Sequence, residues 1–547
     1  MNQLVEFFSE KGYLISPDLL ENLPKDLDKE KFLKLIEEYI KTKEDFIILN
    51  KDVFEGLLRE NNLFDFNWYE FDKAKVEKEK GNGKIYDTFI DIINYDEKKL
   101  NKILTDIKKP ELDLNINEEK NNGSNIIVLK SYIEDSKKRN VKDFVSYFKA
   151  RYITLRNILQ GRQELQNVIS INKLKNKKND ELVSLIGLIC DKKITKNGNI
   201  ILSVEDLTGE INVLVNKNNN ELYNKANDIC LDQVIGINGF FRNNFIFVND
   251  LLLPGIPVIK ELKKANEEDY AAFISDMHVG NKFFFKDDFE KFLKWLNGED
   301  GNEEQKCVAN KIKYLFISGD LVDGVGNYPG QENDLYIKDI YEQYREFVGL
   351  IKKIPNTINV IISPGNHDAL RLAEPQPAIN KSYVEELYNM KNVFLVSNPS
   401  YVNIHSSFDF NGFDVLIYHG MSFNYYASNI DSIRKEGGLL KSDLLMKYLL
   451  ENRHLAPTHT STSYIPNDKE DVLTIDKIPD IFVTGHIHRC SAINYKGITL
   501  INASSWLGQT AFQEKTGLVP EPGRVVLLNL QTRDIKILNF CEDDKCK

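Results

Sequence analysis

Four short motifs that combine histidine with aspartate, asparagine or glycine constrain this chain most, because each directly follows a predicted strand. They are Asp276-Met277-His278, Gly365-Asn366-His367-Asp368, His419-Gly420 and Gly485-His486-Ile487-His488. A fifth element, Gly319-Asp320 followed by Asp323-Gly324, places carboxylates between the first and second motifs. Loops that follow the C-terminal ends of strands meet at one edge of a sheet. The sequence therefore predicts a sheet-containing fold in which one edge collects these side chains.

The strands themselves are predicted from short apolar runs that finish just before each motif. These runs cover residues 270–274, 314–317, 359–362, 415–418 and 481–483. One histidine in such a position is more often a packed structural residue than a ligand. Core packing does not explain five such coincidences in one chain, so we interpret the motif residues as a functional cluster.

The residue types in the cluster indicate metal chemistry, because aspartate, asparagine and neutral imidazole are ligands for first-row divalent metals. Two such cations about 3.5–4 Å apart clamp a phosphodiester and stabilise its attacking and leaving oxygens, and a bound water then loses its proton near neutral pH. The pattern therefore predicts a two-metal phosphoesterase. Since histidine must be neutral to bind a metal, the predicted activity falls as pH drops through the histidine titration range.

Over residues 269–510, the order and the amino-acid sequence of the motifs resemble those of the calcineurin-like metallophosphoesterases. This superfamily includes double-strand-break-repair nucleases. The resemblance implies seven metal ligands in two sets with a shared carboxylate: Asp276, His278 and His488; Asn366, His419 and His486; and Asp320 between the two metals. It also implies that His367 stays off the metals and acts near the leaving oxygen or the scissile phosphate. We expect Asp368 to orient that imidazole, because catalytic histidines need a second group to fix their tautomer.

Longer stretches resemble the small subunits of archaeal family D DNA polymerases, namely Gly319–Gln331, Pro364–Pro377 and Arg453–Pro457. This resemblance implies a 3′→5′ proofreading exonuclease that acts on DNA 3′ ends and forms a heterodimer with a large polymerising subunit. A sliding clamp is a further candidate partner. The resemblance points to Mn²⁺ as the metal, although the ligand mixture also accepts Fe and Zn.

The predicted fold class is multidomain α+β. Helical periodicity, a shift to Lys, Glu, Asn and Asp, and five short strands at near-regular spacing define its parts. The predicted parts are a helical N-terminal domain (1–75), a charged flexible linker (76–140), a connecting helical segment (141–180), an OB-fold β-barrel (181–257) and a calcineurin-like phosphoesterase α/β sandwich (258–547).

Two groups of residues outside the motifs are candidates for contact with nucleic acid. In the predicted barrel they are Phe240, Phe241, Arg242 and Phe245. OB-folds bind single strands through aromatic and basic residues, but aromatics at strand spacing are more often core. In the connecting segment they are Arg151, Arg156 and Arg162, for which a solvated helix face is the simpler interpretation.

The formal net charge of -11 is unfavourable for a protein that holds nucleic acid by itself, because phosphate binding depends on clustered Lys and Arg. A partner that grips the DNA resolves this difficulty. The six cysteines include no CxxC pair, and we interpret Cys541 and Cys546 as incidental thiols rather than a redox or metal pair. No secretory signal and no apolar run of about 18 residues is present, which favours a cytoplasmic protein without a membrane span.

Two rival functions remain open at this stage. One is a phosphoesterase with another substrate, such as a protein phosphatase or a cyclic-nucleotide diesterase. The other is a non-catalytic scaffold, as in the related eukaryotic B-subunits that have lost the metal ligands. We interpret His405, His454 and His459 as surface or core residues. For Arg371 and Arg489 a phosphate contact and a structural salt bridge remain equal alternatives.

Overall fold

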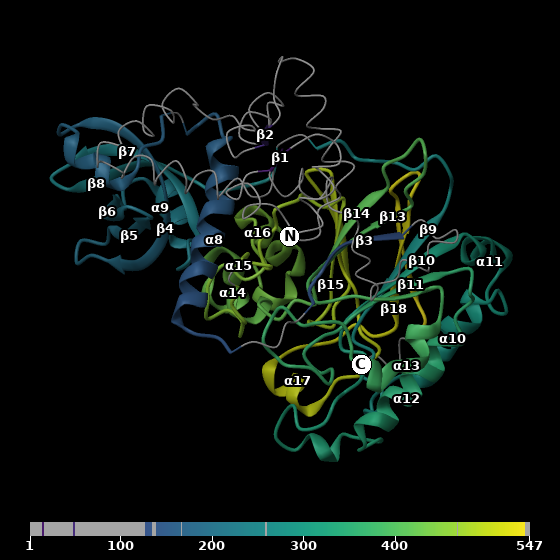
Figure 1. Cartoon of the computed structure of the whole chain (residues 1–547). Coiled ribbons are helices and arrows are strands. Elements are labelled where there is room, and N and C mark those ends of the chain that lie inside the picture. Colours follow the sequence, from purple (N-terminus) through teal and green to yellow (C-terminus); the bar gives the residue numbers. More distant parts are fainter. Residues whose placement is uncertain are drawn as a thin grey trace. The chain divides into compact units, whose positions relative to one another are not determined.

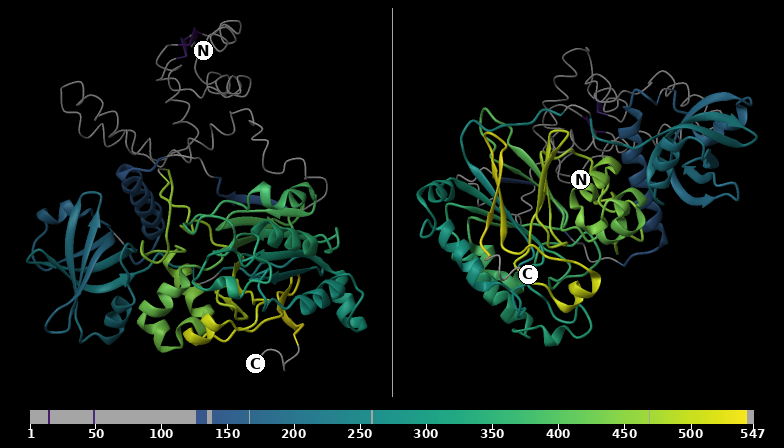
Figure 2. Two further views of the ribbon diagram at one scale, coloured as in Figure 1. Left: turned by 90° about the horizontal axis from the view of Figure 1, so that it is seen from below. Right: turned by 180° about the vertical axis from the view of Figure 1, so that it is seen from behind.

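The computed structural model describes residues 14–15, 48–49, 126–133, 138–165, 167–257, 260–467 and 469–541. The chain divides into two compact units, Met1–Glu119 and Lys120–Lys547. In the first unit, β1 (Leu14–Ile15) pairs in parallel with β2 (Ile48–Leu49). The predicted helical N-terminal domain and most of the predicted linker otherwise lie outside the described residues. The following paragraphs concern the second unit (Figures 1 and 2).

The first of two large sheets has six strands, and its four parallel strands carry three of the sequence motifs. In spatial order the strands are β12 (Val393–Leu395), β11 (Asn359–Ser363), β10 (Ile312–Ser318), β9 (Tyr270–Ile274), β18 (Arg524–Asn529) and β19 (Ile535–Asn539). Strands β9 to β12 run in parallel, and β18 is antiparallel to both β9 and β19. Because β9, β10 and β11 are parallel neighbours, the loops after them emerge at the same edge.

The second sheet also has six strands and carries the other two histidine motifs. In spatial order they are β16 (Ser491–Tyr495), β17 (Ile498–Asn502), β15 (Ile481–Thr484), β14 (Phe413–Ile417), β13 (Ser400–Ile404) and β3 (Ile126–Ser131). Strand β15 runs parallel to β14 and β17. The edge strand β3 belongs to the region predicted as a flexible linker, so the structure differs from that prediction at residues 126–131.

The two sheets pack face to face, and helices cover their outer faces (Figures 1 and 2). Phe273 of the first sheet and Val415 of the second belong to the core between the sheets. Ile274, the next residue after Phe273, belongs instead to the core under the helices. This alternation follows from the two-residue period of a strand. The helices over the first sheet are α10 (Lys286–Leu296), α11 (Glu303–Asn310), α12 (Ile340–Ile351) and α13 (Lys381–Asn389), and those over the second are α14 (Phe423–Asn429), α15 (Asp431–Lys435) and α16 (Ser442–Asn452).

A closed five-stranded barrel precedes the sandwich in the sequence, which confirms the predicted small barrel. Its strands in spatial order are β4 (Glu181–Ile194), β5 (Ile200–Asp206), β6 (Gly209–Val215), β8 (Phe245–Leu252) and β7 (Val234–Arg242), with α9 (Asn220–Asn227) between β6 and β7 in the sequence. The long strand β4 pairs with β5 through its second half and with β7 through its first half. This double pairing closes the barrel.

The helix α8 (Val141–Gln160) begins at a capping box formed by Asn140 and Asp143. It carries Arg151, which is buried and forms an ion pair of 2.6 Å with Asp471. Arg151 also donates to the Pro457 carbonyl. The interpretation of Arg151 as part of a solvated face or a nucleic-acid contact is therefore wrong. Its positive charge pairs with the Asp471 carboxylate in the interior of the protein.

Among the residues that the structure describes, we find no helix of the length and apolar character that a membrane span requires.

Candidate metal centre

All seven candidate ligands lie in loops that follow strands, at the edge where the two sheets meet. Asp276 and His278 follow β9, Asp320 follows β10, and Asn366 follows β11. From the second sheet, His419 follows β14, and His486 and His488 follow β15. Residues separated by more than two hundred positions therefore share one site.

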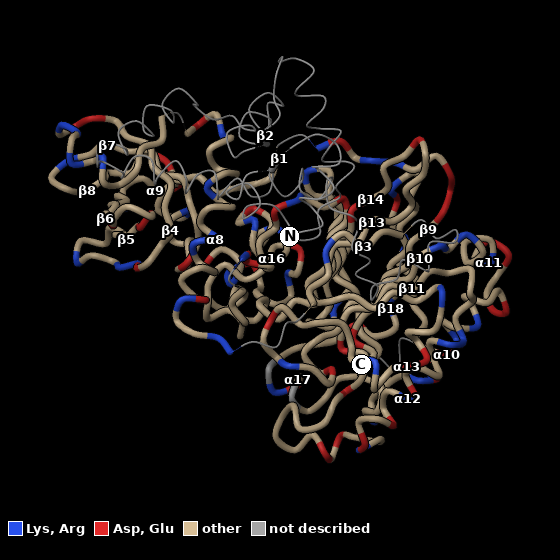
Figure 3. The backbone as a smooth tube through the Cα atoms, in the orientation of Figure 1, with Lys and Arg blue, Asp and Glu red and all other residues tan. Residues whose placement is uncertain are grey.

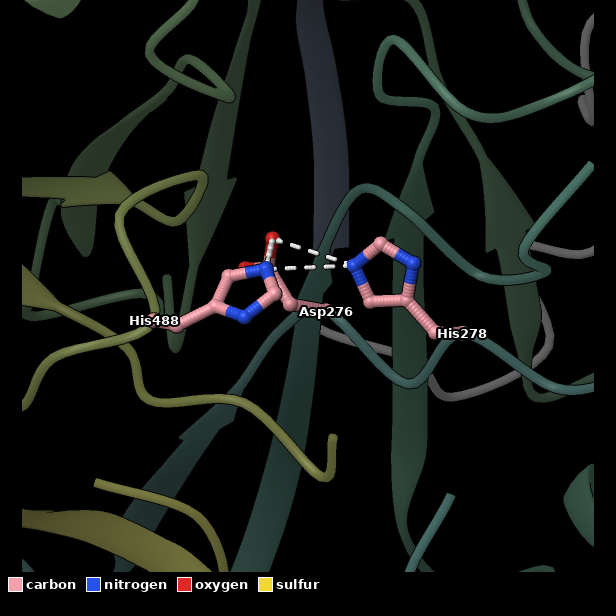
Figure 4. Close-up of side chains that lie close together, drawn as sticks. All are labelled: Asp276, His278 and His488. Atoms are coloured by element: carbon pink, nitrogen blue, oxygen red, sulfur yellow. Dashed lines mark hydrogen bonds and ion pairs between the residues drawn. The ribbon is translucent and has the colours of Figure 1, made fainter. Parts of the chain in front are cut away.

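The first group of ligand atoms comes from Asp276, His278 and His488, whose side chains point toward one another in Figure 4. The Nε2 atoms of His278 and His488 are 3.1 Å apart. His488 Nε2 lies 3.2 Å from Asp276 Oδ1, and His278 Nε2 lies 3.9 Å from the same oxygen. Three buried donor atoms thus converge on one point, as a metal site requires.

The second group is built around the amide oxygen of Asn366. This Oδ1 lies 2.9 Å from His486 Nδ1 and 3.1 Å from His419 Nε2. Asp320 Oδ2 lies 3.3 Å from His419 Nε2 and 3.7 Å from His278 Nε2. Asp320 is therefore adjacent to both groups, which is the position of a shared ligand.

A second ring of polar groups fixes the orientation of the four ligand imidazoles. His278 Nδ1 lies 3.0 Å from Asp323 Oδ1, and His419 Nδ1 donates to the Ser318 carbonyl at 2.8 Å. The two remaining imidazoles are held by amide side chains, a pair that sequence reasoning missed. Asn424 of α14 contacts His486 Nε2 at 2.9 Å, and Gln513 of α17 (Ala511–Thr516) contacts His488 Nδ1 at 2.8 Å.

His367 lines the same cavity, and one of its ring nitrogens lies within 4.8 Å of a ligand atom of His278 and of Asp320. Its Nδ1 donates to the Asp323 carbonyl at 2.8 Å, and its backbone N–H donates to Asp320 Oδ1 at 2.8 Å. The expectation that Asp368 orients this imidazole is corrected. The Asp368 carboxylate accepts from the Gly365 N–H at 2.8 Å and from the Tyr344 hydroxyl at 3.1 Å. Asp368 therefore holds the backbone of the Gly365–Asp368 motif in place through hydrogen bonds.

Burial and mutual charge shift the pKa values of the buried groups in opposite directions. Burial raises the pKa of the Asp320 carboxyl, but His419 and the other nearby imidazoles lower it to well below its usual range. Burial lowers the pKa of His419, yet the Asp320 and Asp276 carboxylates raise it to about 10. Burial and the charge of His419 lower the pKa of His486 to about 3. The Asp320 side of the site therefore has a field that favours positive charge.

Asp320 and Asp368, the two aspartates of this region, have pKa values that are shifted in opposite directions. Burial and the nearby charge of Asp320 together raise the pKa of Asp368 to about 7. The hydrogen bonds from Gly365 and Leu321 oppose this rise but do not reverse it. Asp320 is thus the ionised carboxylate of the pair near neutral pH.

Five of the seven candidate ligands have a positive φ, a conformation that non-glycine residues rarely adopt. They are Asp276 (50°), His278 (49°), Asp320 (49°), His486 (73°) and His488 (53°). Each such residue costs on the order of 1–3 kcal/mol and persists only where the surroundings hold it. Clusters of this kind occur at functional sites, and neither composition nor periodicity predicts them.

The motif glycines are required because ligand side chains occupy the space beside them. A Cβ at Gly365 would overlap Asp320 Oδ1, and a Cβ at Gly485 would overlap Ser275 Oγ and Asp276 Oδ2. The strand ends can approach one another this closely only because Gly365 and Gly485 have no side chain.

A cavity of about 280 Å³ opens beside the ligand atoms. Tyr328, Leu507 and Leu518 line it together with the motif residues. The site therefore offers aromatic and apolar surface next to its charged centre.

The other basic residues weighed from the sequence serve the protein framework. His454 is buried and contacts Asp471, and His459 contacts Asp232 at the surface. His405 lies near the Tyr314 hydroxyl. Arg371 donates to the carbonyls of Ala373 and Pro375, and Arg489 forms an ion pair with Glu521. The structural alternative is therefore the one observed for Arg489. Cys541 is buried, and Cys546 lies outside the described residues.

A family model for the B-subunits of DNA polymerases alpha and epsilon matches residues 271–492. This stretch contains all seven candidate ligands. With the fold and the site, the match defines the class of the protein: a component of a DNA polymerase.

The DNA polymerase II small subunit of Methanothermobacter thermautotrophicus is 38% identical over 508 residues, which cover 90% of this chain and 99% of that protein. The DNA polymerase II small subunit of Pyrococcus furiosus is also 38% identical, over 73% of this chain and 64% of its own length. The chain belongs to the family of archaeal DNA polymerase II small subunits, which confirms the resemblance to family D. A solved structure of an archaeal phosphodiesterase aligns at 13% identity over 49% of this chain and 98% of that one, with a TM-score of 0.24, too low for any inference.

Proposed function

We propose that the chain is the proofreading subunit of its polymerase, a 3′→5′ exonuclease that hydrolyses DNA phosphodiesters with two divalent cations. The observation that carries this proposal is the position of Asp320, 3.7 Å from His278 Nε2 and 3.3 Å from His419 Nε2. A carboxylate adjacent to both ligand groups keeps two cations close together despite their mutual repulsion. We assign the two packed sheets and their helices to the calcineurin-like phosphoesterases as part of the same proposal.

The side chains present fit such a pair of cations. Asp276, His278 and His488 would hold one, and Asn366, His419 and His486 would hold the other, with Asp320 between them. This mixture of carboxylate, amide oxygen and imidazole accepts Mn²⁺, Fe and Zn, and we propose Mn²⁺. When bound, the pair supplies a positive clamp for the phosphodiester and lowers the pKa of an attached water to roughly 7.

The chain's own residues supply positioning and proton transfer. The bond from His367 Nδ1 to the Asp323 carbonyl fixes the tautomer, so that Nε2 is the atom available to the leaving oxygen. Asp323 also holds His278 through its carboxylate. The same residue therefore orients one ligand and the proposed proton donor.

A DNA 3′ end is the substrate that this site and family favour. The side chains of Tyr328, Leu507 and Leu518 offer apolar contact for the sugar and base of a terminal nucleotide. Membership in a small-subunit family supports a large polymerising subunit as the partner. The net charge of -11 is unfavourable for DNA binding by this chain alone, because phosphate binding depends on clustered Lys and Arg. We propose that the large subunit supplies most of the contacts that hold the DNA.

The test is an exonuclease assay on the full chain co-purified with its large subunit. We expect Mn²⁺-dependent release of mononucleotides from the 3′ end of labelled single-stranded DNA, and loss of this release with chelator. His367→Ala should abolish the release while metal content and assembly stay unchanged. His459→Ala, at a surface histidine that contacts Asp232, is the matched control and should behave as the parent protein. Unchanged degradation by the His367 variant would reject the role of that residue.

The alternative function is a scaffold without catalysis. The observation against it is that every ligand position carries a metal-binding residue, whereas a pure scaffold has no need of one. An assembly that binds no Mn²⁺ and releases no nucleotide, yet still forms, would favour the scaffold. Mn²⁺ binding with release of phosphate only from other esters would favour a different substrate.

A further inference from the structure

A row of apolar side chains crosses the outer surface of the barrel, and its aromatic members lie on paired strands. Phe240 of β7 pairs with Phe247 of β8, and Leu182 of β4 pairs with Phe240. Their exposed fractions are 42% for Phe240, 39% for Phe247 and 60% for Leu182. The barrel core is filled instead by inward residues such as Phe241 and Ile246. The exposed row is therefore not explained by core packing.

The row continues around the barrel at lower exposure. Leu214 of β6 pairs with Phe247, and Ile201 of β5 pairs with Leu214. Both of these side chains are half-buried. Neighbouring strands are about 4.8 Å apart, so the apolar side chains of the row lie next to one another across the barrel surface. Phe240 and Phe247 are the two rings that such a surface offers for stacking.

Positive charge borders the aromatic pair. The Arg242 guanidinium lies 5.9 Å from the centre of the Phe247 ring. The segment 171–180, which leads into β4, contains four lysines and one aspartate, so its formal charge is +3 in a chain of -11. One of these lysines, Lys177, forms an ion pair of 2.6 Å with Glu181, the first residue of β4. That aspartate, Asp180, forms an exposed ion pair with Arg242, and its N–H donates to the Phe241 carbonyl. These contacts attach the segment to the end of the barrel where Arg242 lies, in the region labelled β7 and β8 in Figure 3.

We propose that this barrel face, defined as Leu182, Phe240, Arg242, Phe247 and the segment 171–180, binds single-stranded nucleic acid. Bases stack on Phe240 and Phe247, and Lys173, Lys175 and Lys178 contact phosphates, while Arg242 stays paired with Asp180 beside the Phe247 ring. Proteins that bind single strands combine aromatic platforms with a positive groove in this way. Protein interfaces are depleted of lysine, so the lysine segment favours a polyanion over a protein. The site is separate from the metal centre and extends the proposed function with a second place where a DNA strand is held.

The first test is the affinity of the full chain for a fluorescein-labelled oligothymidylate of about 20 nucleotides, longer than the site of one such barrel. Fluorescence anisotropy is measured in EDTA, so that the result does not depend on the metal centre. Phe240→Ala and Phe247→Ala should each weaken binding by about tenfold, since base stacking on an aromatic side chain contributes on this scale. Phe247→Tyr should retain binding, because its ring also stacks.

The control for the aromatic variants is Phe408→Ala. Phe408 is 103% exposed and lies between β13 and β14, outside the barrel. Its loss should leave the affinity unchanged. Thermal unfolding followed by circular dichroism verifies that each variant is folded before its affinity is compared.

The second test is the salt dependence of binding. Lys175→Gln and Lys178→Gln should each reduce the slope of log K against log salt by roughly 0.7, the value for one phosphate contact on a single strand. Failure of the full chain to bind the oligonucleotide, or equal affinities for the parent and the aromatic variants, would overturn the proposal. Unchanged oligonucleotide affinity together with lost assembly with the large subunit would assign the face to protein contact instead. Since every measurement is made without metal, these outcomes say nothing against the exonuclease.

Discussion

The Oδ2 atom of Asp320 lies 3.3 Å from Nε2 of His419. Asp320 follows β10 in one sheet, and His419 follows β14 in the other. This single contact therefore joins the edges of two sheets that pack face to face. The candidate metal centre exists because the sandwich brings these two edges together, and its geometry depends on the packing of the core between the sheets.

Replacement of the shared carboxylate tests this relationship directly. Asp320→Asn removes the negative charge that lies between the two ligand groups, so we expect the chain to lose at least one of the two proposed cations. The metal content per chain, measured by atomic emission after dialysis against Mn²⁺, should fall from two toward one or zero. Asp300→Asn, at an exposed position, is the control and should keep both. Two retained cations in the Asp320 variant would contradict the bridging role.

The amide of Gln513 gives a second prediction, because this side chain lies outside the matched stretch 271–492 yet contacts His488 Nδ1 at 2.8 Å. The Gln513 atom at this contact is the amide nitrogen Nε2, which is a donor. When His488 binds a cation through its own Nε2 and carries its proton on Nδ1, the Gln513 amide turns so that its oxygen accepts that proton. Gln513→Ala should weaken Mn²⁺ binding by about 10–100-fold, and Gln513→Glu should restore it, since a carboxylate accepts the same proton. Competition with a chelator of known affinity measures the effect.

The control for this experiment is Glu514→Ala, the exposed neighbour of Gln513 on α17. It should leave the Mn²⁺ affinity unchanged. If Gln513→Ala and Glu514→Ala were equally damaging, the loss would reflect the helix rather than the contact with His488.

A third prediction concerns stability and pH. Burial raises the pKa of the Glu374 carboxyl to about 7, and hydrogen bonds from Thr462 and Tyr418 only partly oppose this rise. The folded chain therefore keeps this proton at pH values where the unfolded chain has lost it. The contribution of Glu374 to stability should fall as pH rises from about 4.5 to 7 and then level off, with a loss on the order of 3 kcal/mol.

Glu374→Gln imitates the protonated side chain and removes this loss. The variant should gain stability over the parent at pH 8 and differ little from it at pH 4.5, as measured by urea unfolding. Glu385→Gln, exposed on α13, should show no such pH-dependent gain. A gain that is equal at both pH values would show that ionisation of Glu374 is not the cause.

The buried ion pair between Arg151 and Asp471 gives the fourth prediction. Both side chains are at most 1% exposed, and His454 contacts the same carboxylate. Arg151→Met leaves a buried carboxylate without its main partner, so the free energy of unfolding should fall by about 3–5 kcal/mol. The additional change Asp471→Leu should recover part of this loss.

An exposed ion pair provides the comparison. Arg345 contacts Glu342 on the surface of α12, where its side chain is 69% exposed. Arg345→Met should change the free energy of unfolding by no more than about 1 kcal/mol in the same urea titration. A similar loss for both arginine variants would contradict the claim that burial makes the Arg151 pair important.

The residues that meet at the candidate metal centre could be predicted because the information is local. Each ligand follows a strand within a few residues, and a run such as Tyr270–Ile274 identifies that strand without knowledge of the rest of the fold. The barrel was predictable for the same reason, since short strands separated by turn residues form a local pattern. The family resemblance added the proposed division of these ligands into two sets, which spacing alone does not contain.

Errors occurred where the outcome depends on which residues meet across the fold. Asp368 adjoins His367 in the sequence, but its carboxylate turns to Gly365 and Tyr344, while the Asp323 carbonyl orients the imidazole. The sequence of the helix favours a solvated face for Arg151, but Asp471, 320 positions later, forms an ion pair with it in the interior. No periodicity within one helix identifies such a partner.

The amino-acid sequence by itself determined the metal-binding residue types, their order and the strands that they follow, because these are properties of short segments. Only the tertiary structure decided which groups surround them: the amides of Asn424 and Gln513 at two imidazoles, and Asp320 between the two sheets. It also decided that Phe240 and Phe247 face outward while Phe241 faces the barrel core. The physical reason is that a strand's alternation defines two faces, whereas the closure of the barrel and the packing of the sheets determine which face is buried.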